Sequence, residues 1–298
     1  MFFFSALRQY FALSGAQRKF ISSGIYAGNR TPREILDFIR PLARFDENID
    51  NTRSQLTKIG CAGLILLFIA AIVAGNEALT PNIASGLVIF TAVLFVGSFL
   101  LRWFLSSFDL HNNLRLFVVP VLNTISQDMP ENARMIIKLD LRGKTLKSKM
   151  INEKHDNPGW FSYPKISTWT YKDYWFSCKA PMVDGSNLFI NVEDTVRSRK
   201  KTCKSRSGKT KIKTKVKIKH KITAGLAMKT KVYDLSRTDK LQNTFDRVKT
   251  KDKPKRKAVT LTARAVSTDV EARLEPSICL DLIGKILMNA APATAKGA

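Results

Sequence analysis

The sequence predicts an integral membrane α+β protein, in which a two-helix transmembrane hairpin with flanking cytoplasmic helices precedes a C-terminal, mainly antiparallel β-rich cytoplasmic domain. Three observations predict this fold class. Two long segments carry no charged residue, the hydrophobic period changes from near 3.6 to 2 at about Arg134, and one later segment has lysine at every second position.

The same observations divide the 298 residues into five parts. In chain order these are a cytoplasmic N-terminal helical region (1–58), the transmembrane hairpin (59–101, with spans at about 59–76 and 83–101), an amphipathic connecting helix (102–133), a basic β-rich cytoplasmic domain (134–266), and a C-terminal helix and tail (267–298).

The N-terminal region has helical spacing of apolar residues. Its first twenty residues favour a short helix, which either lies in the membrane interface or packs on the rest of the protein. Thr31-Pro32-Arg33-Glu34 then combines an N-cap threonine, a proline at the first helical position and a glutamate three residues after the cap, which predicts a helix start. We expect Pro41 to disturb this helix and a further helix to lead from about Phe45 into the first span.

Two uncharged windows predict the spans. Eighteen residues separate Lys58 from Glu77, and twenty-four separate Glu77 from Arg102. Because a helix needs about 20 apolar residues to cross a hydrocarbon core of about 30 Å, both windows fit a membrane span. The connection at 75–82 is short enough to require a tight turn. The alternative is a buried helical hairpin of a soluble protein, which the slightly short first window keeps open.

Charge predicts the orientation of the hairpin. Nine Lys and Arg residues precede it, forty follow it, and none lies in the connection, so that the formal charge of +25 divides into +4, −1 and +22. Since positive charge marks cytoplasmic segments, both termini are expected in the cytoplasm, with the protein in a plasma or inner membrane.

Beyond the second span, the residues from Phe108 to Gln127 fit a helix with a kink at Pro120. Glu275-Pro276-Ser277 predicts the start of a C-terminal helix. Period-2 alternation predicts five strands between them, in the segments ARMIIKLDL, KISTWTYKDYWFSCKA, NLFINVEDTV, the lysine run KTKIKTKVKIKHK and AVTLTARAVS.

The lysine run is the strongest single pattern. An extended chain puts its lysines on one face and Ile212, Val216, Ile218 and Ile222 on the other. If residues 204–208 form a turn, a hairpin results in which Lys201 faces Lys211, and Glu193, opposite Lys219, gives the only charge relief. The candidate anion-binding residues on this face are Arg197, Arg199, Lys201, Lys211, Lys213, Lys215, Lys217 and Lys219.

A protective role competes with anion binding for this lysine row, because edge strands use lysines to resist aggregation. Eight aromatic residues between Trp160 and Phe176 add a second pattern, which fits a domain core, a membrane interface or stacking on nucleic-acid bases. For the last interpretation the candidate contacts are Trp169, Tyr171 and Trp175.

Motifs for catalysis are incomplete. Two Gly-Lys-Thr triplets lack the glycine that a phosphate-binding loop needs five residues earlier, where Lys138 and Cys203 stand instead. The three histidines and four cysteines have no metal-ligand spacing, and His220 fits a partly buried sheet residue. The sequence therefore predicts no enzyme activity, no cofactor and no metal.

The function expected from these patterns is that of a non-enzymatic two-span membrane protein, a scaffold or subunit of a membrane assembly, whose basic β-domain contacts an acidic membrane surface or an acidic protein. One alternative is a membrane-anchored nucleic-acid-binding protein. The others are a subunit of a transport or secretion complex, with homo- or hetero-oligomers in the membrane, and an unrecognised membrane enzyme.

Overall fold

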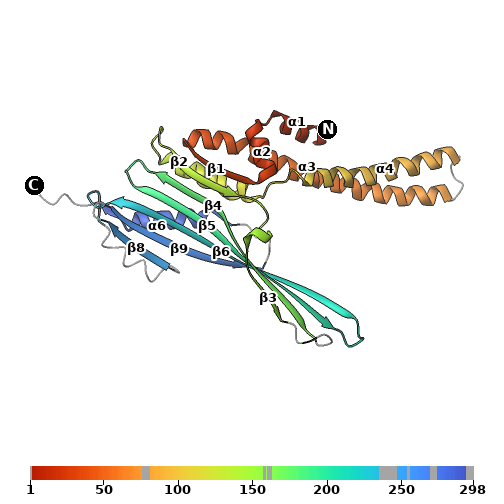
Figure 1. Ribbon diagram of the computed structural model, residues 1–298. Helices are drawn as coiled ribbons and strands as arrows, with labels where there is room; N and C mark the ends of the chain where they lie inside the picture. Colours follow the sequence, from red (N-terminus) through yellow and green to blue (C-terminus); the bar gives the residue numbers. More distant parts are fainter. Residues whose placement is uncertain are drawn as a thin grey trace, which may run out of the picture. The chain divides into compact units, whose positions relative to one another are not determined.

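The computed structural model describes residues 2–75, 81–156, 159, 163–234, 247–253, 256–268 and 274–292. It is an α+β protein with an antiparallel sheet and two long apolar helices, as the sequence predicts (Figure 1). The chain forms two compact units, Met1–Ser23 with Phe38–Arg115, and Gly24–Asp37 with Leu116–Ala298. The expected turn around Glu77 lies outside the described residues.

The first unit is helical. It contains α1 (Phe2–Ala12), α2 (Gly15–Ser23), most of α3 (Pro32–Gly75) and α4 (Pro81–Ser106). The predicted start of α3 is confirmed, because Thr31 N–H donates to Glu34 Oε2 at 3.1 Å and Glu34 N–H donates to Thr31 Oγ1 at 3.4 Å. The expected disturbance at Pro41 was wrong, since one helix runs through it. Proline has a helical φ, and its cost is limited to one lost hydrogen bond and local crowding.

Glycines allow α3 and α4 to approach each other closely. A Cβ atom on Gly60 would lie 2.6 Å from Ser98 Oγ, and one on Gly63 would lie 3.2 Å from the Phe95 nitrogen. Small residues at such crossings are typical of helix pairs that pack without a hydrophobic driving force.

Both helices are long and apolar enough to cross a membrane. Only 17% of the most apolar window of α3 and 11% of that of α4 is buried, so neither window forms the core of a globular unit. Large apolar side chains such as Phe68 and Phe90 are exposed instead.

The helix expected over Phe108–Gln127 is shorter than predicted. It consists of a π-helical turn at Leu114–Val118 followed by α5 (Val119–Gln127). Pro120 therefore does not kink a continuous α-helix but lies in the first turn of α5, where its missing N–H costs least.

The second unit is built on an eight-stranded sheet in the order β1-β2-β4-β5-β6-β9-β8, with β3 paired to β4 and every pair antiparallel. Its strands are β1 (Ile25–Arg30), β2 (Met135–Asp140), β3 (Met150–Asp156), β4 (Lys165–Pro181), β5 (Asn187–Lys204), β6 (Thr210–Lys229), β8 (Arg247–Lys253) and β9 (Arg256–Ser267). The remaining elements are the short 3₁₀ turn Lys147–Lys149, the helix α6 (Pro276–Met288), and the small pair β7 (Tyr233–Asp234) with β10 (Ala291–Pro292).

The five predicted strands are confirmed as β2, β4, β5, β6 and β9, and α6 begins where the sequence predicts. The sequence did not predict β1, β3, β8 or the β7–β10 pair. One face of the sheet packs against α6, which contacts β6 and β9 and also α5. We call this the covered face. On β5 and β6 it holds the even-numbered residues, such as Ile190, Val192 and Ala224, which are fully buried.

The β5–β6 hairpin has the predicted faces but a different register. Ser205 N–H donates to the Lys209 carbonyl, and Gly208 takes a left-handed φ of 77° in the turn. The turn therefore begins one residue later and ends one residue later than expected, so Lys201 pairs with Lys213 rather than Lys211. A shift of two positions changes every partner but leaves each side chain on its own face.

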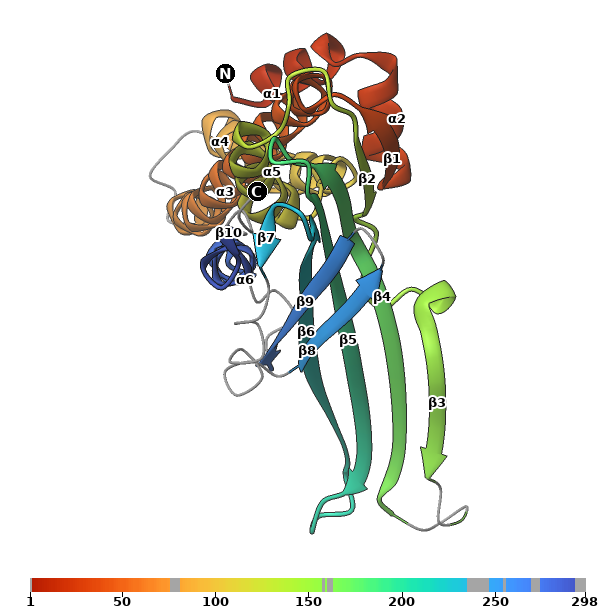
Figure 2. The same ribbon diagram turned by 90° about the vertical axis from the view of Figure 1, so that its left-hand side faces the viewer.

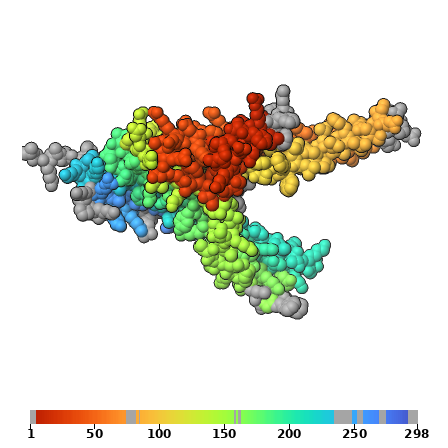
Figure 3. Space-filling model, turned by 45° about the horizontal axis from the view of Figure 1, so that its top comes forward, coloured from red at the N-terminus to blue at the C-terminus, as the bar shows by residue number. Residues whose placement is uncertain are grey.

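The core ends before the strands do. Val196 and Ile218 form the last fully buried pair, and β9 also stops there, with Ser267 opposite Ile218. Beyond this pair the sheet continues as four strands that we call the arm, namely β3 with residues 165–170 of β4, 197–204 of β5 and 210–217 of β6. Figures 2 and 3 show the arm extending from the rest of the second unit.

Two side chains on the same face of the hairpin test this boundary. Val196 is 0% exposed, whereas Ile212 is 58% exposed, although the sequence pattern assigns both to the apolar side. We expect Val196→Asp to destabilise the protein by about 3 kcal/mol or more, because it buries an unpaired charge, and Ile212→Asp to cost less than about 1 kcal/mol. Denaturant unfolding of the full chain in detergent measures both, and equal costs would contradict the boundary.

Candidate anion-binding face

Eight basic side chains gather on the uncovered face of β5 and β6. We call this set the basic face, and its members are Arg197, Arg199, Lys201, Lys211, Lys213, Lys215, Lys217 and Lys219. All eight are exposed, and in the described part of the chain none of them lies within 4.0 Å of a carboxylate. The structure thus brings all eight predicted residues together.

Register places these cations directly opposite one another. Arg197 pairs with Lys217, Arg199 with Lys215, and Lys201 with Lys213. Like charges at opposite positions of an antiparallel pair destabilise a sheet, so the face costs folding free energy unless an anion relieves it. A shallow hollow of about 570 Å³ lies among these side chains and reaches Thr268, just past the end of β9.

Among the described residues, carboxylates neutralise lysines of this hairpin face only at its base. Glu193 stands opposite Lys221 rather than opposite Lys219, which corrects the predicted pair. Its carboxylate oxygens lie 3.5 Å from Lys221 Nζ and 3.4 Å from Lys172 Nζ. Glu193 therefore neutralises two lysines below the basic face and none within it.

The covered face carries a buried ionic row at the same level of the sheet. Asp173, Asp194 and His220 lie side by side on β4, β5 and β6, with Asp173 opposite Asp194 and Asp194 opposite His220. All three are buried. His220 Nδ1 lies 2.8 Å from Asp194 Oδ1, so the histidine orients this carboxylate, as its place on the apolar side of the lysine strand suggests.

Two lysines from the segment between β2 and β3 neutralise the carboxylates of the row. Lys144 Nζ lies 3.0 Å from Asp194 Oδ2, and Lys149 Nζ lies 2.7 Å from Asp173 Oδ1 and 3.2 Å from an oxygen of Asp140. Both ammonium groups are buried. The cluster therefore fixes the 141–149 segment onto the sheet where the arm begins.

The two carboxylates of the row differ in proton affinity. Burial raises the pKa of Asp173 to about 6, because desolvation outweighs the contact with Lys149. Burial also acts on Asp194, but its hydrogen bond with His220 and the charge of Lys144 outweigh desolvation and hold its pKa below the usual range. Among the described residues no group of three His, Cys, Asp or Glu side chains could hold a metal ion.

The aromatic candidates do not join the basic face. Trp175 is 2% exposed and packs edge-on against Phe117 at 5.3 Å, so it is a core residue rather than a ligand contact. Trp169 pairs with Ser198 and Tyr171 with Val196, which places both on the opposite face of the sheet. Trp169 Nε1 also donates to Glu153 Oε1 at 2.6 Å. Trp160 and Phe161 lie outside the described residues.

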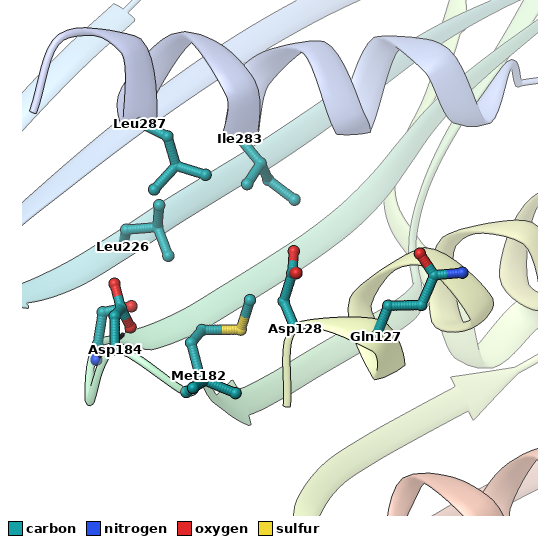
Figure 4. Close-up of a pocket in the computed structure, with 9 residues that line it drawn as sticks. Gln127, Asp128, Met182, Asp184, Leu226, Ile283 and Leu287 are labelled. Carbon is teal, nitrogen blue, oxygen red and sulfur yellow. Dashed lines mark hydrogen bonds between the residues drawn. The ribbon is translucent and has the colours of Figure 1, made fainter. Parts of the chain in front are cut away.

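A second hollow, of about 590 Å³, lies beneath α6 on the covered side (Figure 4). Leu226, Ile283 and Leu287 form much of its lining, and Asp128 points into it. Asp184 at its rim accepts hydrogen bonds from the Ser186 N–H at 2.8 Å and from Tyr233 Oη at 2.7 Å, which assigns it to the β4–β5 turn. None of the described residues that line this hollow is basic, so it is separate from the basic face.

No protein-family model, curated protein or solved structure matches this chain.

The ionic row predicts a defined pH dependence of stability. Because the pKa of Asp173 is higher in the folded protein than in an unfolded chain, the folded state binds this proton more tightly, and stability is lost as the pH rises from about 4 through 6. Relative to Asp173→Asn, the wild type should lose about 1 to 2 kcal/mol between pH 4 and pH 7.

Denaturant unfolding in detergent across this range measures the difference between wild type and Asp173→Asn. Asp184→Asn is the control, because hydrogen bonds hold the pKa of Asp184 low despite partial burial and its titration lies below the range. Parallel stability curves for wild type and Asp173→Asn would show that Asp173 is not buried as described.

Proposed function

We propose that this protein is a non-enzymatic, membrane-anchored binding protein, in which α3 and α4 cross a bilayer and the basic face contacts an acidic membrane surface. Such a protein would serve as a scaffold or subunit of a membrane assembly. The proposal rests first on one observation: eight exposed cations share one face of a sheet with no carboxylate within reach among the described residues.

Exposed apolar helix surface supports the membrane anchor. The windows of α3 and α4 are long enough to span a bilayer and are left almost entirely uncovered. Lipid would remove this surface from water at no further structural cost. The basic residues before and after the hairpin support a cytoplasmic position for both termini.

Electrostatics supports the acidic leaflet as the partner. A basic residue near such a surface gains about 1 kcal/mol, so eight on one face give a strong summed attraction even after partial screening by salt. Anchoring in the same membrane would also hold the sheet at a high effective concentration near the lipid. An acidic protein surface would satisfy the same charges, with or without oligomers of the two-span hairpin.

Nucleic acid is a weaker alternative. Single strands are held by phosphate contacts combined with stacking of bases on aromatic rings. Here Trp169 and Tyr171 occupy the face opposite the basic side chains, so one strand cannot use both on the same face of the sheet. A role in a transport or secretion complex is compatible with the two spans but draws on no further observation.

Neutralising the basic face tests the proposal. Replacing Lys211, Lys213, Lys215 and Lys217 together by Gln should preserve folding, because all four are exposed. The full chain in neutral nanodiscs should then bind vesicles with acidic lipid at least about tenfold more weakly, since about 1 kcal/mol per basic residue is removed four times. Co-sedimentation with such vesicles at several salt concentrations measures the change.

A matched variant separates local from overall charge. Lys147, Lys231, Lys249 and Lys251 are also exposed and lie outside the basic face, and changing these four to Gln removes the same net charge. This control should bind acidic vesicles nearly as well as the wild type. If both quadruple variants lose affinity equally, net charge and not the basic face drives binding.

The membrane anchor predicts a definite topology. A reporter fused after Ala298 should lie in the cytoplasm, and a cysteine introduced at Ala78 should react with membrane-impermeant reagents added from outside. Labelling of intact cells, with the native Cys61 replaced by serine, measures the second outcome. A C-terminus accessible from outside the cell would rule out contact between the basic face and the cytoplasmic leaflet.

A further inference from the structure

One edge of the arm offers unpaired backbone groups. β9 pairs with β6 only from Ile218 onward, and within the described residues the stretch 210–217 of β6 pairs with β5 alone. The other side of that stretch is an open strand edge of eight residues, about 26 Å long at the usual rise of a strand. It continues the line that β9 occupies alongside the rest of β6.

The hairpin geometry fixes which backbone groups face this edge. Ser205 N–H donates to the carbonyl of Lys209, its directly opposite residue, so this is a hydrogen-bonded pair of the ladder. Such pairs alternate with non-hydrogen-bonded ones, so the lysines at 211, 213, 215 and 217 direct their N–H and C=O groups toward β5. Ile212, Thr214 and Val216 therefore direct theirs toward the open edge.

The side chains along the edge select its occupant. A second copy of β6 would place lysines beside lysines, which is unfavourable. Nucleic acid has no alternating amide donors and carbonyl acceptors with which to extend the sheet. A polypeptide strand with an acidic residue at every second position would satisfy both the backbone groups and the lysines.

We propose that the open edge of β6 binds an extended acidic peptide segment, which adds as an antiparallel strand where β9 ends. Its acidic side chains lie opposite the lysines in non-hydrogen-bonded pairs, the arrangement that brings cross-strand side chains closest. Its intervening residues, β-branched or apolar, lie beside Ile212 and Val216 on the other face. The hollow lined by Lys215, Lys217 and Thr268 leaves room for one end of the added peptide beside the end of β9.

This inference concerns the edge of β6, whereas the membrane contact concerns its face, so either can fail without the other. The probe is a fluorescent nine-residue peptide with glutamate at five alternating positions and valine or threonine between them. Its control has the same composition with the five glutamates contiguous. Both are titrated by anisotropy against the full chain in a neutral detergent.

The alternating peptide should bind at least about tenfold more tightly than its isomer, because only alternation puts every carboxylate on the lysine face. Thr214→Pro removes an edge N–H at an exposed position where proline is tolerated, and it should weaken this peptide at least about tenfold. Thr214→Val keeps the N–H and should bind like the wild type. Binding of both variants to acidic vesicles should be unchanged, since every lysine remains.

Peptides with N-methyl groups test the same point without altering the protein. N-methylation of the valine and threonine residues should abolish binding, because their amides face β6, whereas N-methylation of the glutamates should be tolerated. Equal affinity of the two isomers would mean simple charge attraction and overturn the proposal. So would equal effects of the two N-methyl series, or full peptide binding by a folded Thr214→Pro variant.

Discussion

The second unit depends on one costly arrangement: two carboxylates, Asp173 and Asp194, stand directly opposite each other on the buried face of neighbouring strands. Unpaired, they would repel each other in a medium that solvates them poorly. Lys144, Lys149 and His220 offset part of that penalty by ion pairs and a hydrogen bond. To supply the lysines, the 141–149 segment must lie over the sheet at this level, so the row fixes both the segment and the end of the core.

The arm lies beyond the ionic row and beyond the last fully buried pair of the hairpin, so it has no hydrophobic core of its own. Among the described residues of the second unit no helix covers the arm, so its two faces can differ in chemistry without affecting a hydrophobic interior. Cross-strand contacts hold it, including Trp169 with Glu153 and the pair of His155 and Ser167 at 2.9 Å. Three cross-strand pairs of like charges oppose these contacts and destabilise the arm. This opposition of like charges on exposed strands supports the proposal that an anionic ligand binds there and relieves it.

The sequence predicts which side chains of the β5–β6 hairpin share a face, because strand alternation is a local property. Alternation along each strand places Lys213 and Val196 on opposite faces. The register of the hairpin differs from the predicted one by two residues at the Ser205–Lys209 turn, and a shift of two residues leaves every side chain on its own face. The prediction of faces fails where a β-bulge interrupts the alternation of a strand. A bulge in β4 pairs Tyr174 with Glu193 and Phe176 with Val192, so Phe176 joins Trp175 on the covered face instead of sharing the face of Tyr174, and no local pattern marks that bulge. The polar strand β3 gave no period-2 apolar signal either.

The ionic row was beyond sequence reasoning for a different reason. Asp173, Asp194 and His220 come together only through the combined registers of two hairpins, and Lys144 reaches them from a segment without regular structure. In the sequence, Asp173, Asp194 and Lys144 each resemble an ordinary surface charge, and only His220 is expected to be partly buried. The helices α3 and α4, in contrast, can be predicted almost without tertiary information, because their apolar segments are uninterrupted runs of eighteen and twenty-four uncharged residues.

The most direct measurement compares the two faces of the arm at a bilayer. Thr168 pairs with Arg199 and so shares the basic face, whereas Ser198 on the neighbouring strand points to the opposite face. Spin labels at cysteines introduced at these two positions, in a chain whose native cysteines are replaced, report depth by power saturation in nanodiscs. We predict that the label at 168 lies in the headgroup region only when the lipid is acidic, and that the label at 198 stays in water. Equal accessibility of the two labels in neutral and acidic nanodiscs would contradict membrane recognition by the basic face.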